Sequence, residues 1–539
     1  MKNEICLPCK QKSTMYENIL NSATKYPNRN ALIYFFKNIK YKTLLKRINS
    51  FAYHLKDIGV KKDDIVTICL PNIPDAVYLL YAINQIGAIA NIVHPLFTTS
   101  QMDENLFLTK SKYLFVLDSN YEKYASLVEK YSISLFACSP KDDAPIKIRI
   151  GYSLTNKNIK SSDMSLFYKA KCEKEYDKDY LKDSVLLHSG GTSGKSKIIA
   201  LSNFAINSVS TNTPWIMNWT SFKNKNILAV LPMFHGFGLV KGIHSMLCHG
   251  GGDVLMPKFS RNITVNYIAR NKLHILIGVP VLYEALLSKK NFRFKKLRHL
   301  EIAFVGGDYV SSSLLERFNI RMEKAKSRCR LREGYGLTEA VNVCAVNTHQ
   351  FYKPGTVGRL LPNVKGIIID ENDNILDNNQ EGEILIGGDT IMNGYRFNDD
   401  DSVNEKSIFI DKNGDKYIRT GDFGFIDKDR FLYFKTRLKR IVKVKGVNVF
   451  PSMIEDVATS FNFVYETCAI GIQDEKYGHI IKLYVKLSKE YQGSREEAIK
   501  KIDERIVSRL GIYSKPKEII ILDKMPHTAL GKIDYKALK

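Results

Sequence analysis

Short apolar runs alternate with helical patterns through most of residues 15–307, and this alternation restricts the fold more than any other feature of the chain. Runs such as 112–118 (KYLFVLD) and 300–307 (LEIAFVGG) have the length and apolar character of buried strands. The segment 41–59 repeats apolar residues at helical spacing and ends on Gly59. Strands that alternate with helices favour a parallel or mixed sheet covered by helices, so we predict an α/β fold.

The pattern changes after about residue 352, where short strands are separated by Asn-Gly and Asp-rich turns. In the last part of the chain, strands again mix with helices, one of which runs from a Ser494 cap to Gly511. A chain of 539 residues is too long for one ordinary domain. The predicted parts are a large N-terminal domain over 1–436 made of α/β sheets, with a β-rich subdomain at about 352–436, and a small, mobile α+β C-terminal domain over 437–539.

The chain is strongly basic, with 80 Lys and Arg residues against 56 Asp and Glu residues and a net charge of +24. Such a charge is typical of proteins that bind nucleic acid, a membrane surface or an anionic substrate. The basic residues are scattered and form no long tract or stripe interleaved with aromatic residues, the pattern that binds nucleic acid. We therefore keep a nucleic-acid-binding protein with a degenerate nucleotide site only as the less favoured alternative.

The nine cysteines have no regular spacing, which is typical of free thiols in a reducing cytoplasm. Cys6 and Cys9 form a lone C-x-x-C with no second pair at zinc spacing, so no metal or redox role is expected for them. The N-terminus lacks the apolar core of a secretory signal. The most apolar stretch, 76–93, is interrupted by amide side chains, which predicts a buried core helix and no transmembrane segment. We expect a cytoplasmic protein.

The glycine-rich stretch 187–197 (LHSGGTSGKSK) resembles a Walker A loop but fails two tests for one. The motif G-x-x-x-x-G-K-[ST] requires a glycine where this chain has Ser189. It also requires a helix after the loop, whereas 197–201 (KIIAL) is a second strand and Ser202 caps the helix that follows. The loop therefore joins two strands, and Lys195, which a Walker loop would use, has no predicted role.

A loop of this kind can still hold phosphate oxygens, because glycine frees backbone N–H groups to point at an anion. The hydroxyl groups of Ser189, Thr192 and Ser193 and the charge of Lys197 add further donors. These groups predict a flexible clamp on a polyphosphate.

The loop resembles the S-G-T-T-G-x-P-K loop of the adenylate-forming enzymes, which include acyl-CoA and aryl-CoA synthetases and peptide-synthetase adenylation domains. Five further blocks that are similar to those of this family follow in the family's order. They are LPMFHGFGL (231–239), GYGLTEA (334–340), GEILIGGDTIMNGY (382–395) with YIRTGDFGFID (417–427), TRLKRIVKVKGVNVFPSMIE (436–455) and PHTALGKIDYKAL (526–538). The resemblance covers nearly the whole chain.

The resemblance implies an ATP-dependent acid–thiol ligase that uses ATP, Mg²⁺ and CoA. The enzyme would form an acyl-adenylate with release of pyrophosphate and then transfer the acyl group to a thiol. The positions that match the family's ATP-binding residues are Ser189, Gly190, Gly191, Thr192, Ser193, Gly194, Lys197, Gly307, Tyr335, Gly336, Thr338, Asp422 and Arg437. Asp422 and Arg437 would bind the ribose, and Tyr335 would stack on adenine. The positions that match the acyl pocket are His235, Gly236 and Gly307.

The resemblance also assigns the catalytic roles. Lys532 matches the lysine that stabilises negative charge at the α-phosphate in the transition state, and Glu339 matches the residue that holds Mg²⁺. Lys443, together with Asn448, matches residues that contact the adenylate or the thiol-transfer site. Lys439 falls at the hinge about which the family's small domain swings between its two orientations.

A calcium loop is the competing interpretation of the acidic run 411–422, whose alternate positions carry oxygen ligands. The sixth position of that run is Lys416, where a calcium loop needs glycine, and the twelfth is Asp422 in place of glutamate. A hairpin turn is the better explanation.

Four positions depart from the family pattern and leave details of the pocket open. They are Ser196 in place of the loop proline, Asp308 where alanine is common, Glu333 where an amide often meets adenine, and Thr436 before Arg437.

The acid and its acceptor stay open. Amino-acid-activating relatives usually carry an aspartate in the block where this chain has His235, so an α-amino acid is not expected. A fatty acid or an aryl acid is expected, with the fatty acid preferred because nothing in HGFGLVKGIH (235–244) obviously polarises the pocket. The acceptor is CoA or, as the alternative, the phosphopantetheine arm of a separate acyl carrier protein.

Overall fold

The computed structural model describes residues 9–155, 164–169, 171–189, 197–270, 273–288, 297–308, 310–397, 402–444, 447–474, 478–527 and 533–538. Its helices are α1 (Met15–Lys25), α2 (Tyr41–Asp57), α3 (Pro74–Gln85), α4 (Thr99–Thr109), α5 (Tyr121–Tyr131), α6 (Ile146–Thr155), α7 (Asn203–Thr211), α8 (Thr213–Met217), α9 (Ser245–Leu247), α10 (Arg261–Ala269), α11 (Pro280–Leu287), α12 (Ser312–Lys324), α13 (Ser402–Ser407), α14 (Pro451–Thr459) and α15 (Arg495–Leu510).

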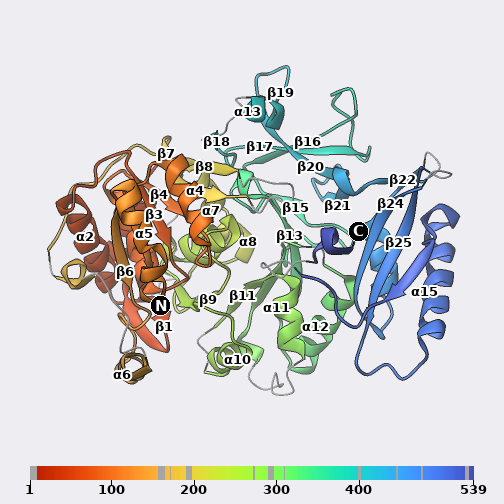
Figure 1. The fold of residues 1–539 in the computed structure, drawn as a ribbon, viewed down its shortest axis with the longest axis horizontal. Coiled ribbons are helices and arrows are strands. Elements are labelled where there is room, and N and C mark those ends of the chain that lie inside the picture. The colour runs from red at the N-terminus through yellow and green to blue at the C-terminus, as the bar shows by residue number, and fades with distance from the viewer. Residues whose placement is uncertain are drawn as a thin grey trace.

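Two large, mainly parallel sheets form most of the chain before residue 397 (Figure 1). The first has the order β15 (Arg359–Leu360), β14 (Ala345–Val346), β13 (Leu331–Tyr335), β12 (Ile302–Val305), β11 (Ile275–Gly278), β9 (Asn226–Ala229), β10 (Gly252–Leu255), β1 (Asn30–Tyr34) and β2 (Lys37–Lys40). The second has the order β18 (Gly394–Arg396), β8 (Ile198–Ser202), β7 (Asp183–His188), β4 (Ile89–Ile92), β3 (Ile65–Cys69), β5 (Tyr113–Leu117) and β6 (Ser134–Cys138). Helices between the strands cover these sheets, which confirms the predicted α/β fold.

Among the described residues, three smaller sheets accompany the two large ones. An antiparallel sheet contains β16 (Val364–Ile369), β17 (Gly382–Gly388), β20 (Lys416–Ile426), β19 (Ile408–Ile410) and β21 (Leu432–Arg437), and is the β-rich region above the large sheets in Figure 1. The last part, drawn in blue, contains β24 (Val464–Asp474), β25 (Gly478–Leu487) and β26 (Glu518–Ile521), beside a hairpin of β22 (Val442–Val444) and β23 (Val447–Val449). Helix α15 begins at the predicted Ser494 cap, whose side chain accepts a hydrogen bond from the Glu497 N–H group.

The prediction of one helix over 76–93 is wrong at its C-terminal end. Helix α3 is buried along its whole length, as expected, but it ends at Gln85. Gly87 then takes a left-handed φ of 76°, and the chain continues as β4 inside the seven-stranded sheet. The apolar run is therefore a buried helix followed by a buried strand. Within the described part of the chain, no helix is long and apolar enough to cross a membrane.

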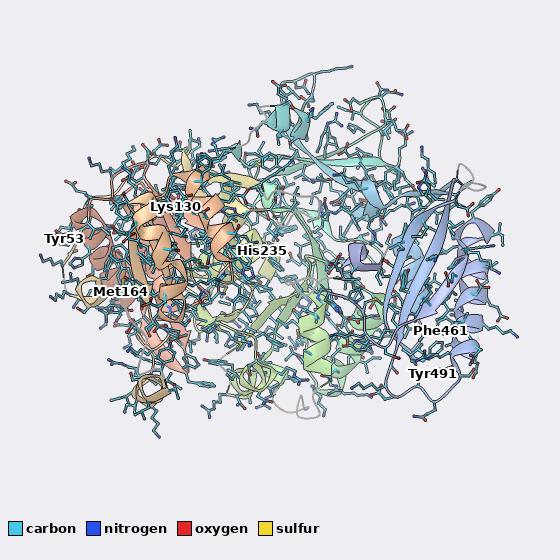
Figure 2. The ribbon with its side chains drawn as sticks, in the orientation of Figure 1. Tyr53, Lys130, Met164, His235, Phe461 and Tyr491 are labelled. Atoms are coloured by element: carbon cyan, nitrogen blue, oxygen red, sulfur yellow. The ribbon has the colours of Figure 1, made fainter. Side chains whose placement is uncertain are left out.

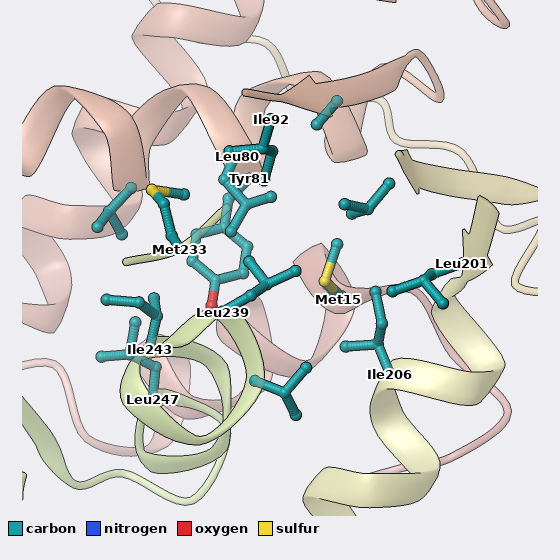
Figure 3. Close-up of a cluster of buried hydrophobic side chains, with 14 of the residues drawn as sticks. Met15, Leu80, Tyr81, Ile92, Leu201, Ile206, Met233, Leu239, Ile243 and Leu247 are labelled. Atoms are coloured by element: carbon teal, nitrogen blue, oxygen red, sulfur yellow. The ribbon is translucent and has the colours of Figure 1, made fainter. Parts of the chain in front are cut away.

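The core between the two large sheets positions a helical segment that carries the HGFGLVKGIH motif. This segment is a π-helix, η3 (Phe237–His244), followed directly by α9. In Figure 3, Leu239, Ile243 and Leu247 lie on the side of the segment that faces Tyr81 and Met233. These contacts fix the rotation of η3 about its axis and so decide which of its residues face the neighbouring cavity.

Candidate functional site

The glycine-rich stretch joins two antiparallel strands, as predicted. His188 at the end of β7 pairs with Ile198 at the start of β8. Ser189 and Lys197 close the base of the loop, because the Ser189 N–H group donates to the Lys197 carbonyl (2.9 Å) and the Ser189 hydroxyl accepts from the Lys197 N–H group (3.0 Å). Where the description resumes at Lys197, the chain enters β8 and reaches helix α7 only after Ser202, its cap, so the helix that a Walker loop needs directly after its Gly-Lys-Ser end is replaced by a strand. Outside the described residues lie Gly190, Gly191, Thr192, Ser193, Gly194, Lys195 and Ser196.

Tyr395 connects two predicted site residues that lie far apart in the sequence. The Lys197 ammonium lies over the Tyr395 ring, 4.5 Å from its centroid. The Tyr395 hydroxyl donates a hydrogen bond to Glu339 Oε1 (2.9 Å). Because β18 pairs with β8, Tyr395 is held directly beside the base of the glycine-rich loop. Glu339 lies next to Thr338 in the short helix η5 (Thr338–Ala340). Through Tyr395, its carboxylate is kept near Lys197 at the base of the glycine-rich loop, where a carboxylate oxygen could hold Mg²⁺.

Asp422 is the centre of a second group of predicted residues. Its side chain is almost fully buried, and Oδ2 accepts a hydrogen bond from the Tyr335 hydroxyl (2.6 Å). Its other oxygen, Oδ1, lies 2.9 Å from Nε of Arg437, the residue directly opposite on β21. Burial raises the pKa of Asp422, while Arg437 and Tyr335 act in the opposite direction. The carboxylate is therefore held in one orientation, as binding a ribose diol requires.

The acidic run 411–422 is a hairpin turn and not a calcium loop. Asp411 Oδ1 accepts hydrogen bonds from the N–H groups of Asn413 (2.9 Å) and Asp415 (2.9 Å), which shapes the turn between β19 and β20. Asp422 lies farther along β20 and is bound to Tyr335. The prediction of a hairpin turn is confirmed.

An apolar cavity, called the acid cavity below, lies against the ends of β11, β12 and β13. Of the predicted site residues, Gly307, Tyr335 and Gly336 line it. Gly336 is required by close packing, since a Cβ atom there would lie 1.0 Å from the Asn342 carbonyl oxygen. The full lining is Ile216, Met217, Ile227, Phe237, Lys241, Ile277, Phe304, Val305, Gly306, Gly307, Gly334, Tyr335, Gly336, Asn342, Val343 and Val346.

His235 and Gly236 lie next to the acid cavity but are not among the residues that line it. Figure 2 places His235 near the middle of the molecule. Its ring packs against Phe234 at a centroid distance of 4.6 Å, and Gly236 directly precedes η3. A Cβ atom at Gly236 would approach the side chain of Asn342, a lining residue, to 3.1 Å. The two predicted residues thus support the wall from behind in this structure.

Two residues of the site were missed by sequence reasoning. Tyr395 ends a block that was recognised, but its contact with Lys197 depends on the pairing of β18 with β8. Lys241 lies inside HGFGLVKGIH and lines the acid cavity. The sequence did contain a sign of this: Lys241 is the one charged residue in an apolar run, and it follows Phe237 by four residues, which places the two side chains on the same face of a helix.

Glu333, one of the departures from the family pattern, is held as a partly buried carboxyl at the start of the GYG segment. Its Oε2 accepts a long hydrogen bond from Asn347 (3.5 Å). Burial raises the pKa of Glu333 to about 7. Near neutral pH this carboxyl therefore keeps its proton in part of the molecules and can then donate a hydrogen bond, as an amide does.

Replacing Glu333 with Gln should stabilise the protein at high pH. The folded carboxyl has a higher pKa than the unfolded one, so folding stability from Glu333 is present below about pH 4.5 and is lost as pH rises through about 7. The melting temperature of E333Q should therefore increasingly exceed that of the wild type between about pH 5 and 8. The exposed Glu316→Gln is the control. Parallel melting curves at all pH values would contradict the assignment.

The predicted hinge region begins directly after Arg437. Lys439 is exposed in the short helix η6 (Leu438–Arg440). Its neighbour Arg440 is anchored on the C-terminal sheet side, donating to Glu455 Oε1 (2.7 Å) and to the Ala469 carbonyl (3.2 Å). Lys443 and Asn448 are both exposed and face each other across the β22–β23 hairpin, so the structure brings them together. Lys532 lies outside the described residues.

The short helix η8 (Tyr535–Leu538) brings Tyr535 close enough to Asp308 for the two groups to interact electrostatically. Burial raises the pKa of Tyr535, and although Arg440 opposes this rise, the carboxylates of Glu455 and Asp308 add to it. Asp308 directly follows Gly307, a residue of the cavity wall. Tyr535 is three residues from Lys532 in the sequence.

Cys9 has partners that the sequence did not suggest. Its sulfur lies in a buried group with His244 and Cys248, in which the potential ligand atoms are all within 4.8 Å of one another. Both ring nitrogens of His244 already have hydrogen-bond partners, the Tyr81 hydroxyl (3.0 Å) and Asn207 Oδ1 (2.8 Å). The group is thus a satisfied hydrogen-bond network, and we assign it no metal. Cys6 lies outside the described residues.

The sequence model described as "AMP-binding enzyme" matches residues 19–396, and that of the "AMP-binding enzyme C-terminal domain" matches residues 453–532. The chain is 28% identical to a probable 4-coumarate–CoA ligase 3 of Dictyostelium discoideum, covering 94% of this chain and 90% of that protein. It is 27% identical to a long-chain-fatty-acid–CoA ligase of Bacillus subtilis (strain 168), covering 98% and 94%.

Solved structures share the whole fold. ATP-bound MatB from Rhodopseudomonas palustris superposes with a TM-score of 0.84 at 20% identity, over 97% of this chain and 98% of that one. The o-succinylbenzoate CoA synthetase MenE from Bacillus subtilis, in complex with its acyl-adenylate intermediate, superposes with a TM-score of 0.79 at 22% identity, over 99% and 98%.

Proposed function

Because the chain belongs to the AMP-binding enzyme family, whose members related to it are acyl- and aryl-CoA ligases, we propose that it joins a carboxylic acid to CoA with consumption of ATP. The observation that supports this most is the position of Tyr335. Its hydroxyl binds Asp422, the proposed ribose ligand, while the residue also lines the acid cavity. One side chain thus lies between a place for a nucleotide and a place for an apolar acid, as adenylation needs.

In the first step, a carboxylate oxygen of the acid attacks the α-phosphorus of ATP, and the bond to pyrophosphate breaks. Lys532 stabilises the negative charge that develops on the α-phosphate, and Lys197 with the glycine-rich loop binds the departing phosphates. Glu339, oriented by Tyr395, would hold Mg²⁺, and a bound Mg²⁺ would neutralise phosphate charge.

In the second step, the thiol of CoA loses its proton and its sulfur attacks the acyl carbonyl carbon, which releases AMP. Lys443 and Asn448 form an exposed pair on one hairpin and are suited to contact the phosphates of the incoming thiol carrier. Rotation about Lys439 would exchange the Lys532 segment for this hairpin at the site.

The relatives do not choose between a fatty acid and an aryl acid. One is named a 4-coumarate–CoA ligase and the other a long-chain-fatty-acid–CoA ligase, and their identities to this chain differ by one percentage point, 28% against 27%. A free-standing acyl carrier protein is the alternative acceptor. The net charge of +24 would favour docking of an acidic carrier.

The proposed function is tested by acid-dependent exchange of labelled pyrophosphate into ATP over a broad acid panel, with CoA consumption measured in parallel. We expect at least one acid to support exchange and to consume CoA stoichiometrically. Exchange with no loss of CoA, but with acylation of added carrier protein, would favour the carrier. Absence of exchange with every acid would contradict the ligase.

A further inference from the structure

Lys241 is a buried cationic side chain in the wall of an otherwise apolar cavity. It lies in the π-helix η3, is 5% exposed, and lines the acid cavity with residues such as Ile216, Met217 and Ile277. Buried lysines are rare unless a partner compensates the cost of removing the charge from water. The partners of Lys241 therefore decide what this residue is for.

The protein provides only neutral partners among the residues described. The Lys241 ammonium donates to the Val209 carbonyl (3.1 Å) and to the Thr213 hydroxyl (3.2 Å). An ammonium group has three donors, so one donor is left over after these two bonds. No aspartate or glutamate of the described part of the chain is among the groups that favour its charged form, which are the thiols of Cys248 and Cys9.

The missing counter-charge has a measurable effect on the free protein. Burial lowers the pKa of Lys241 to about 7, and the two thiols only partly oppose this. An anion that enters the cavity would reverse the shift, because an opposite charge within a few ångström favours the charged form of lysine. A ligand with a carboxylate at this end of the cavity would therefore bind with uptake of a proton.

We propose that Lys241 is a subsite for a second carboxylate, so that the acid activated by this enzyme is a compact dicarboxylic acid. One carboxylate reacts with ATP beside Gly307 and Tyr335, and the other pairs with Lys241, which lines the same cavity. This inference rests on the proposed function, and it replaces the expected fatty acid by an acid with a charge at both ends.

The size of the acid cavity agrees with a compact acid. It encloses about 40 Å³. A single water needs roughly 10–15 Å³ measured in this way, so the cavity admits a short spacer and no long acyl chain without rearrangement. The π-helical geometry adds one residue to the turn between Phe237 and Lys241, and such local insertions are often found where a side chain is aimed at a ligand.

The test uses sets of three acids that share one carbon skeleton: a monoacid, the matching diacid and the monomethyl ester of that diacid. One set is hexanoate, adipate and monomethyl adipate, and another is benzoate, isophthalate and monomethyl isophthalate. Straight-chain diacids from malonate to sebacate, each with its monoacid, complete the panel. Acid-dependent pyrophosphate exchange gives kcat/KM for each acid. For the best skeleton, the wild type should prefer the diacid over the monoacid and over the half-ester at least about tenfold, because only the diacid forms an ion pair.

Lys241→Met removes the charge and keeps an unbranched side chain that is one atom shorter. In this variant the ratio of kcat/KM for the diacid to kcat/KM for the matched monoacid should fall at least about 100-fold, because the second carboxylate of the diacid would be buried without a counter-charge. Lys223→Met, the same substitution at an exposed lysine close to β9, should leave both values unchanged. Melting temperatures of the two variants report whether each is folded.

The outcomes separate this inference from the proposed function. If no acid supports exchange, the ligase function itself fails. If monoacids support exchange and no diacid or half-ester series shows the preference, the ligase function stands and the Lys241 subsite is overturned. A half-ester that equals the diacid would likewise overturn the ion pair. The preference of the wild type decides the question even if Lys241→Met does not fold.

Discussion

Replacing Lys532 with alanine is expected to reduce acid-dependent pyrophosphate exchange by at least about 100-fold, since loss of one preorganised charge stabiliser commonly costs 10²–10³ in rate. The attack of a carboxylate on the α-phosphate brings two anions together, and Lys532, in the last sequence block, is the cation that we propose for this step. Thiol transfer should be spared, because rotation about Lys439 would replace the Lys532 segment at the site by the β22–β23 hairpin for that step. A chemically prepared acyl-adenylate should therefore still be converted to acyl-CoA by the variant.

The matched control is Lys524→Ala, an exposed lysine in the same C-terminal segment, which should leave both half-reactions intact. Comparison of the half-reactions distinguishes a catalytic role from damage to the fold. Equal loss of both would show that the variant is misfolded or that Lys532 serves only the packing of the segment. Exchange at the wild-type rate would remove Lys532 from the mechanism.

Replacing Asp422 with alanine is expected to weaken ATP binding by about 100-fold or more, measured by titration calorimetry. A hydrogen bond to a charged group contributes about 1.5–3 kcal/mol, and Asp422 is proposed to accept two from the ribose. The substitution also removes the acceptor of the buried Tyr335 hydroxyl and the ionic partner of Arg437. Tyr335 would lose its fixed position in the wall of the acid cavity, so the affinity for the acid should fall as well.

Asp427→Ala provides a control of the same chemical type. Asp427 is a buried carboxylate just past the end of the same strand, β20, where it pairs with Lys353 at 2.5 Å. Its loss should lower the melting temperature and leave the affinity for ATP unchanged. If both variants lose ATP binding equally, the effect of Asp422 comes from the stability of the sheet and not from contact with the nucleotide.

Local rules predicted much of the site's framework. The strand–loop–strand setting followed from two apolar runs and a serine cap within twenty residues, and β7, β8 and α7 lie where those signals placed them. The hairpin at Asp411 followed from turn chemistry in the same way, because the bonds that shape it join residues at most four apart. Information of this kind is contained in the sequence near each element.

The rest depended on contacts between distant segments. The predicted end of helix α3 was too far along the chain. Both α3 and most of β4 are buried, so both are largely apolar, and the hydrophobic pattern shows no change from helical to strand periodicity at the boundary. Tyr395 reaches Lys197 only through a strand pairing across nearly two hundred residues. Lys241 was passed over since a charge in an apolar run shows neither whether it is buried nor whether it has a counter-ion.

The order of strands in the two large sheets also determines how the chain leaves the ribosome. Strand β1 has no parallel partner until β10 has been synthesised, some two hundred residues later. Strand β8 likewise remains an unpaired edge of its sheet until β18 has been synthesised. The nine-stranded sheet therefore remains incomplete until residue 360 has emerged, and the seven-stranded sheet until residue 396, with apolar faces and unpaired backbone groups exposed in the meantime. A nascent chain of this protein needs protection during most of its synthesis, and a polypeptide that stops before β18 cannot complete the sheet that holds the glycine-rich loop.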